Sequence, residues 1–184
     1  GVQWLRDRMK FFKKAPETEK IVKSLNNNND IYLVPAFTGL GAPYWDANAR
    51  GVLSGITRDT SPKEIVRATI EAVAYQTFDL FEAMKHDGLR PKIVKVDGGM
   101  VMNNWFSQFL SDIVNVKVLR PKVQETTALG AAFMAGLHLG IYKSLKDISK
   151  NWNLDKKFSP KMKNKSRTIL INGWEKAVKR ALIN

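Results

Sequence analysis

Two consecutive glycines, Gly98 and Gly99, form the local pattern in this sequence that is most informative about chemistry. They follow Val94-Lys95-Val96-Asp97, which has the composition of a strand, and they precede a helix that we expect from Asn103 onward. Glycine lets the backbone pass close to a ligand, and the first turn of a helix offers unpaired N–H groups at its electropositive end. This order of residues favours a nucleotide site, and a plain tight turn is the alternative that the pattern alone leaves open.

Other residues that could perform chemistry are few. Asp97 could bind a metal or take part in a reaction, but an aspartate before two glycines more often shapes the turn. The two histidines, His86 and His138, have no ligand partners nearby in the sequence, so surface or packing roles are expected for both. Cysteine is absent, which excludes disulfides, thiolate zinc sites and cysteine nucleophiles, and no serine nucleophile motif is recognisable. From the residues we predict neither a metal site nor a hydrolase.

The elements that would position the two glycines alternate between helix and strand. We expect strands where β-branched and aromatic residues cluster, at 31–34, 51–56, 93–96 and 116–119. Helical spacing of apolar residues predicts helices at 2–14, from Pro16 to the asparagine run at 26–29, and at 61–88, 103–114, 126–139 and 173–182. The start at Ser61 is the clearest, because Pro62 and Glu64 follow it as in a capping box. This order predicts an α/β domain with partly parallel pairing of strands, preceded in the chain by an antiparallel pair.

Two further expectations concern packing. The glycines and alanines between 130 and 136 predict that the penultimate helix closely approaches its neighbour. The segment between the first two strands, 35–46, is too apolar for a mere linker, and we expect Phe37, Tyr44 and Trp45 to be packing residues there.

Composition limits the classes of function. The chain has 184 residues with 44% hydrophobic content, and it contains no apolar run long enough for a membrane span and no signal peptide pattern, so we expect a cytoplasmic protein. The net charge of +13 would ordinarily suggest nucleic acid as a partner, and residues 143–184 supply +9 of it. Those lysines lack interleaved aromatic residues for base stacking, so a solvated basic face is the preferred interpretation and nucleic acid the minor one.

Several motifs together resemble those of the carbohydrate kinases that share the actin-like ATPase architecture. Gly51-x-Leu53-x-Gly55-Ile56, followed at a fixed distance by Glu64-Ile65-x-x-Ala68-Thr69-Ile70-Glu71, is similar to the second signature of that family. The segments 3–7, 34–46 and 125–132 resemble the glycerol kinases within the family. The resemblance covers almost the whole chain and fades only across 151–171. It implies an actin-like ATPase (ribonuclease H-like) C-terminal domain with a mixed sheet and packed helices, ATP and Mg²⁺ as cofactors, and glycerol as the acceptor of the ATP γ-phosphate.

The resemblance also implies which residues would hold the nucleotide base. Gln3, Gly99 and Asn103 match the positions that grip adenine in glycerol kinases. Gln3 could instead be an exposed polar residue on an amphipathic helix, and Asn103 could simply be the first residue of a helix. The matching Mg²⁺ ligands, the phosphate-binding loop and the catalytic aspartate of the family have no counterpart in this sequence, so no catalytic residue is assigned.

We therefore interpret the chain as the carboxyl-terminal part of such an enzyme, which also fits its start at Gly1. Residues 1–142 are expected to form the nucleotide-binding domain, and 143–184 a basic extension with a terminal helix. Alone, the chain should be inactive and should expose an apolar face that the amino-terminal half would cover, so that it self-associates. A catalytically dead nucleotide-binding or assembly remnant is the alternative, and a homo-oligomer is left open.

Overall fold

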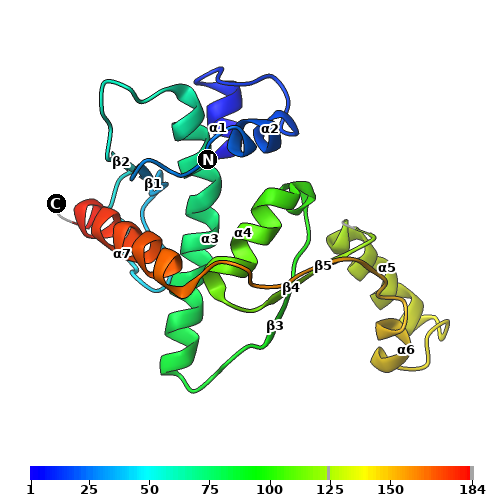
Figure 1. Ribbon diagram of the computed structural model, residues 1–184. Helices are drawn as coiled ribbons and strands as arrows, with labels where there is room; N and C mark the ends of the chain where they lie inside the picture. Colours follow the sequence, from blue (N-terminus) through cyan, green and yellow to red (C-terminus); the bar gives the residue numbers. More distant parts are fainter. Residues whose placement is uncertain (124, 183–184) are drawn as a thin grey trace.

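The computed structural model describes residues 1–123 and 125–182 (Figure 1). The helices are α1 (Val2–Asp7), α2 (Glu17–Lys23), α3 (Pro62–His86), α4 (Asn104–Val114), α5 (Thr126–His138), α6 (Leu145–Ser149) and α7 (Asn164–Ala181), with a 3-10 helix η1 (Gly99–Met102) before α4. The strands are β1 (Tyr32–Val34), β2 (Val52–Ser54), β3 (Ile93–Lys95), β4 (Lys117–Pro121) and β5 (Leu154–Phe158).

The strands form two small sheets. β1 and β2 pair antiparallel, as expected for the first two strands. The second sheet has the order β3-β4-β5, in which β3 and β4 run parallel and β5 runs antiparallel to β4. The parallel pair is connected through η1 and α4, which is the crossover that a parallel pair needs. This arrangement confirms a mixed α/β architecture.

Helix α3 is the centre of the packed body (Figure 1). It begins at Ser61, whose side chain and that of Glu64 form the predicted capping box, and it ends before Gly88, which has a positive φ of 84°. Tyr75 of α3 stacks on the completely buried Trp174 of α7, with ring centroids 5.3 Å apart. Neither α3 nor any other helix in the described ranges is long and apolar enough to cross a membrane.

The amino-terminal helix is shorter than the sequence predicts. We expected a helix over 2–14, but α1 ends at Asp7. Lys10 adopts a left-handed backbone conformation with a φ of 60°, which a continuing α-helix does not allow. The turn lets Phe12 enter the same core as Leu5, so burial of both side chains outweighs the helical periodicity.

The carboxyl-terminal region contains more regular structure than the sequence predicts. A single helix over 173–182 was expected, whereas α7 spans Asn164–Ala181 and is preceded by α6 and β5. β5 completes the second sheet, and α7 packs on β1 and β2. The division of the chain at residue 142 stays a prediction, and the last two residues of the expected extension, 183 and 184, lie outside the described part.

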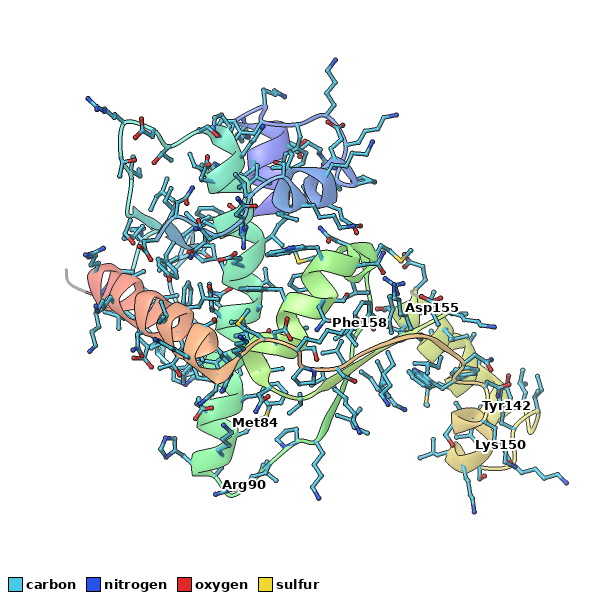
Figure 2. The ribbon with its side chains drawn as sticks, viewed as in Figure 1. Met84, Arg90, Tyr142, Lys150, Asp155 and Phe158 are labelled. Carbon is cyan, nitrogen blue, oxygen red and sulfur yellow. The ribbon has the colours of Figure 1, made fainter. Side chains whose placement is uncertain are left out.

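Helices α5 and α6 form an arm that projects from the sheet (Figure 1). We expected the small residues of α5 to bring it close to a neighbouring helix, and this is wrong for most of them. Gly136 alone among the described residues of α5 is buried, and it packs against Tyr142 in the arm itself. Figure 2 shows Tyr142 and Lys150 on this arm, away from the body. Trp45 also departs from its expected packing role, since its side chain is 79% exposed.

Candidate nucleotide-binding site

The two parallel strands bring their carboxyl ends to one edge of the second sheet. β3 is followed by Asp97 and the two glycines, and β4 is followed by α5. The two connections meet, because the Thr126 hydroxyl at the start of α5 donates a hydrogen bond to Asp97 Oδ2. Asp97 thus shapes the turn and links it to α5. In open α/β sheets, the crevice outside the carboxyl ends of the strands is where ligands bind.

The two glycines at this edge have different roles. Gly98 has a φ of 85°, a conformation that side chains disfavour, so the turn itself requires glycine there. Gly99 starts η1 without a positive φ, and a Cβ added to it would meet no atom within 4 Å. The described fold therefore does not need glycine at position 99. The missing side chain instead leaves open space beside the backbone, where a ligand could approach.

Asn103 is the amino-terminal cap of α4. Its Oδ1 accepts a hydrogen bond of 3.0 Å from the backbone N–H of Phe106, which is the structural role that the sequence left open for it. Its Nδ2 donates to Thr18 Oγ1 at 3.4 Å, a long bond that ties α4 to α2. An amide nitrogen carries two hydrogens, so one donor remains for a ligand.

Gln3 lies exposed on α1, and its side chain forms no hydrogen bond with the described residues. α1 packs on α3, while α2, the next helix, packs on both α3 and α4. Gly99 and Asn103 lie at the two ends of one short turn, whereas Gln3 lies on α1, whose packing partner is α3.

Positively charged side chains lie on all three strands of the sheet that carries the turn. Lys156 Nζ donates to Asn104 Oδ1 at 3.2 Å, and Lys95 Nζ lies 4.2 Å from the centroid of the Trp152 ring. Arg120 is buried at the end of β4 and donates to the carbonyl oxygen of Val101 inside η1. Sequence reasoning missed Arg120 and Lys156, and the arginine directly after Val118-Leu119 at the end of an expected strand was the signal that could have found the first.

The most strongly perturbed acidic groups belong to the packed body. Burial raises the pKa of Glu71, which is completely buried, although Arg67 Nε lies only 2.7 Å from its carboxylate and opposes this shift. The Tyr75 hydroxyl donates to the same carboxylate at 3.1 Å. These partners occupy Glu71 in the core, so we assign no general base to it. Residues 1–123 and 125–182 also contain no group of three acidic or histidine side chains that could hold a metal ion.

Comparison with known proteins places this geometry in a family. The model of the FGGY family of carbohydrate kinases, C-terminal domain, matches residues 1–139. The chain is 54% identical over 180 residues to glycerol kinase 1 of Pseudomonas aeruginosa, covering 98% of this chain and 36% of that protein. The crystal structure of Plasmodium falciparum glycerol kinase with ADP superposes with a TM-score of 0.87 at 38% identity, covering 100% of this chain and 37% of that one.

A third relative supports the fold alone. The xylulose kinase from Lactobacillus acidophilus superposes with a TM-score of 0.78 at 24% identity, covering 97% of this chain and 36% of that one. These neighbours are sugar kinases of the actin-like ATPase fold, as expected, and this chain spans little more than a third of their length. The chain matches the carboxyl-terminal part of glycerol kinases, and it belongs to the FGGY family of carbohydrate kinases, whose C-terminal domain it carries.

Proposed function

We propose that this chain is the adenine-binding part of a glycerol kinase, which in its full form transfers the γ-phosphate of ATP to glycerol and yields glycerol 3-phosphate. The observation that carries the proposal is the open space beside Gly99, which follows β3 of the parallel pair. Asn103, whose side chain caps α4, lies at the other end of the same turn. The names of the relatives support glycerol as the acceptor, since the relatives compared above at 54% and 38% identity are glycerol kinases.

Each of the three residues contributes one contact in this proposal. The backbone at Gly99 passes against the purine, because no side chain keeps the ligand away. The Nδ2 group of Asn103 donates its remaining hydrogen to the base, while its Oδ1 stays with Phe106. Gln3, an exposed amide on α1, is the third contact in this proposal.

Gly99, Asn103 and Gln3 contact only the base in this proposal, and not the phosphates of the nucleotide. The described residues include no cluster of acidic or histidine side chains that fits Mg²⁺, so we assign no ligand of that ion to them. In phosphoryl transfer the metal neutralises the charge that develops on the transferred group, and a base lies near the acceptor hydroxyl. Both functions, and the binding of glycerol, belong in this proposal to the remainder of the polypeptide.

Nucleotide binding by the chain itself is the first test. A net hydrogen bond contributes about 0.5–1.5 kcal/mol, and a millimolar complex needs about 4 kcal/mol in total. Three contacts barely reach that sum, so we expect ADP to bind with a Kd in the millimolar range. Titration with ADP, followed by the amide NMR signals of residues 97–106, measures this affinity.

A matched pair of variants locates the site. Gly99→Leu fills the open space and should abolish the ADP-dependent shifts. Gly41→Leu is the control, because Gly41 also has no atom within 4 Å of an added Cβ and no positive φ, but lies in the segment 35–46 between β1 and β2. Submicromolar binding, or equal loss in both variants, would contradict the proposal.

The exposed apolar surface supports a role for the remaining polypeptide. β3 is an edge strand that pairs on one side with β4, and its Ile93 side chain is 52% exposed. Met134 and Ile141 on the α5–α6 arm are also exposed, at 55% and 69%. Monomeric proteins rarely leave a strand edge and apolar helix residues uncovered, so we propose that the rest of a kinase chain covers them.

Complementation tests this arrangement. Glycerol phosphorylation is measured with the chain alone, and after addition of the part of Pseudomonas aeruginosa glycerol kinase 1 that precedes its matching region. We expect no glycerol 3-phosphate from the chain alone and formation of it from the mixture. Activity of the chain alone would show that a catalytic base lies within it. If the mixture forms a stable complex but no glycerol 3-phosphate, the chain would be a catalytically dead remnant.

A further inference from the structure

Arg120 is a charged side chain buried at the point where β4 meets the glycine turn. Its exposed fraction is 6%. Removing a guanidinium from water costs several kcal/mol unless its donors are paired. Its Nη1 donates to the carbonyl oxygens of Val101 at 2.8 Å and of Met102 at 3.3 Å. Its Nε and Nη2 both lie 2.7 Å from Asp155 Oδ2. The guanidinium is therefore oriented from two sides.

The two carbonyls that Arg120 holds are the last two of η1, the short helix that begins at Gly99. The carboxyl end of a helix leaves carbonyl groups without partners inside the helix. Arg120 supplies charge-assisted donors to them, and the fully buried hydroxyl of Ser107 adds a second donor to Val101 O at 2.9 Å. The turn from Gly99 to Asn103 is thus fixed to β4 at its far end.

Asp155 reaches this turn from β5. Figure 2 shows Asp155 and Phe158 on that strand, and Arg120 on β4 pairs with Lys156 in the antiparallel ladder. The Phe158 ring lies 5.6 Å from the Arg120 guanidinium carbon and packs against it. Asp155 itself is 40% exposed and uses one carboxylate oxygen for Arg120, so an asparagine fits in its place without a change of shape.

We infer that Arg120 is a positioning residue for nucleotide binding and that Asp155, on β5, sets its orientation. This inference rests on the function proposed above for Gly99 and Asn103. Neither Arg120 nor Asp155 needs to touch the nucleotide, because Arg120 acts through the backbone of η1. It follows that β5, which lies in the region that the sequence presents as a basic extension, controls affinity at the adenine end.

The experiment uses the whole chain and three variants. Asp155→Asn removes the charge that orients Arg120, and Arg120→Lys keeps the charge but cannot span both sets of acceptors. Asp147→Asn is the control, since Asp147 forms a surface pair with Lys150 in the arm at 2.8 Å. For each protein we would measure the Kd for ADP by NMR and the amide hydrogen exchange of residues 99–103. The urea midpoint reports any general loss of stability.

We expect Asp155→Asn to weaken ADP binding about tenfold, the effect of losing one hydrogen bond to a charged group. Amide exchange of 99–103 should rise in the same variant, while Asp147→Asn changes neither quantity. If Asp155 acts through Arg120, adding Asp155→Asn to Arg120→Lys should cause little further loss of affinity.

Two results would overturn the inference. One is unchanged amide exchange of the turn in Asp155→Asn, and the other is faster exchange with an unchanged Kd for ADP. Absence of ADP binding by the unaltered chain would instead overturn the proposed function. In that case the exchange data still decide whether Arg120 and Asp155 hold the turn.

Discussion

Helices α3 and α5 are both rich in alanine, yet the structure uses them in opposite ways. In α3, Ala68, Ala72 and Ala74 are buried against neighbouring elements. In α5, Ala131, Ala132 and Ala135 are exposed. The difference teaches that small residues permit a close approach without specifying the partner. The partner of α3 lies within this chain, and we propose that the partner of α5 belongs to the remainder of the kinase.

The largest expected difference between body and arm concerns two tryptophans. Trp174→Ala removes a completely buried ring that stacks on Tyr75 and donates to Asp79 at 2.9 Å. We expect it to lower the free energy of unfolding by about 3–5 kcal/mol. Trp152→Ala loses a contact with Lys95 near the arm and should cost about 0.5–1 kcal/mol. Urea denaturation measures both, and equal losses would contradict the division into body and arm.

The second prediction concerns pH and the body alone. Burial raises the pKa of Asp79 to about 6, although hydrogen bonds from Trp174 and Tyr44 oppose the shift, and Glu175 adds negative charge nearby. The folded protein therefore binds this proton more tightly than the unfolded chain. Its contribution to stability is complete below about pH 4 and is lost as the pH rises through about 6. A shift of two units, reduced by solvent screening, corresponds to roughly 2 kcal/mol.

Asp79→Asn isolates this contribution, because the amide stays neutral and can still accept from Trp174. The free energy of unfolding of both proteins is measured in urea from pH 4 to pH 8. As the pH rises, the unaltered protein should lose roughly 2 kcal/mol relative to Asp79→Asn. A difference that does not vary with pH would show that Asp79 titrates normally in the folded protein.

A third prediction is that replacing glycine by alanine lowers stability in the body and raises it in the arm. Gly173 of α7 lies against Tyr32, where an added Cβ would be 2.1 Å from the hydroxyl oxygen, so Gly173→Ala should destabilise by about 1–3 kcal/mol. Gly130 of α5 has no atom within 4 Å of an added Cβ, and Gly130→Ala should stabilise the helix by about 0.5–1 kcal/mol. The thermal unfolding midpoint checks the sign for Gly173→Ala, and the amide exchange of α5, which should slow, checks it for Gly130→Ala. Destabilisation by Gly130→Ala would show that α5 packs closely on another surface.

The smallest effect on the stability of the whole chain is expected from a change inside the arm. Phe133 and Tyr142 form an edge-to-face pair with ring centroids 5.6 Å apart, which contributes about 0.5–1.5 kcal/mol. Phe133→Ala should raise the amide exchange of α5 while the urea midpoint of the whole chain stays unchanged. A shifted midpoint would mean that the arm unfolds together with the body.

Sequence reasoning succeeded where the deciding interactions are local. The start of α3 follows from three residues that interact with one another, Ser61, Pro62 and Glu64, so no knowledge of the rest was needed. β5 was missed because Leu154-Asp155-Lys156-Lys157-Phe158 has a poor strand composition and is held by its pairing with β4. The early end of α1 was missed for a similar reason, since the burial of Phe12 depends on the whole core.

The candidate site shows the same limit. That Gly99 and Asn103 lie close together could be predicted, because both belong to one short segment, and their role toward a nucleotide stays a prediction. Their anchor could not be predicted, because Arg120 and Asp155 are 35 positions apart and meet only when β4 and β5 pair. The contact between Asp97 and Thr126 likewise depends on the parallel alignment of β3 and β4.

The α5–α6 arm is an insertion between β4 and β5, two strands that pair with each other. Two antiparallel neighbours need only a two-residue turn between them, yet this chain inserts the whole α5–α6 arm at that point. The base of the insertion is closed by a hydrogen bond of 2.9 Å from the Lys122 N–H to the Asn153 carbonyl. The entropy of closing a loop grows only slowly with its length. Evolution could therefore lengthen, trim or replace this excursion while the hairpin beneath it, and the turn that the hairpin holds, kept their form.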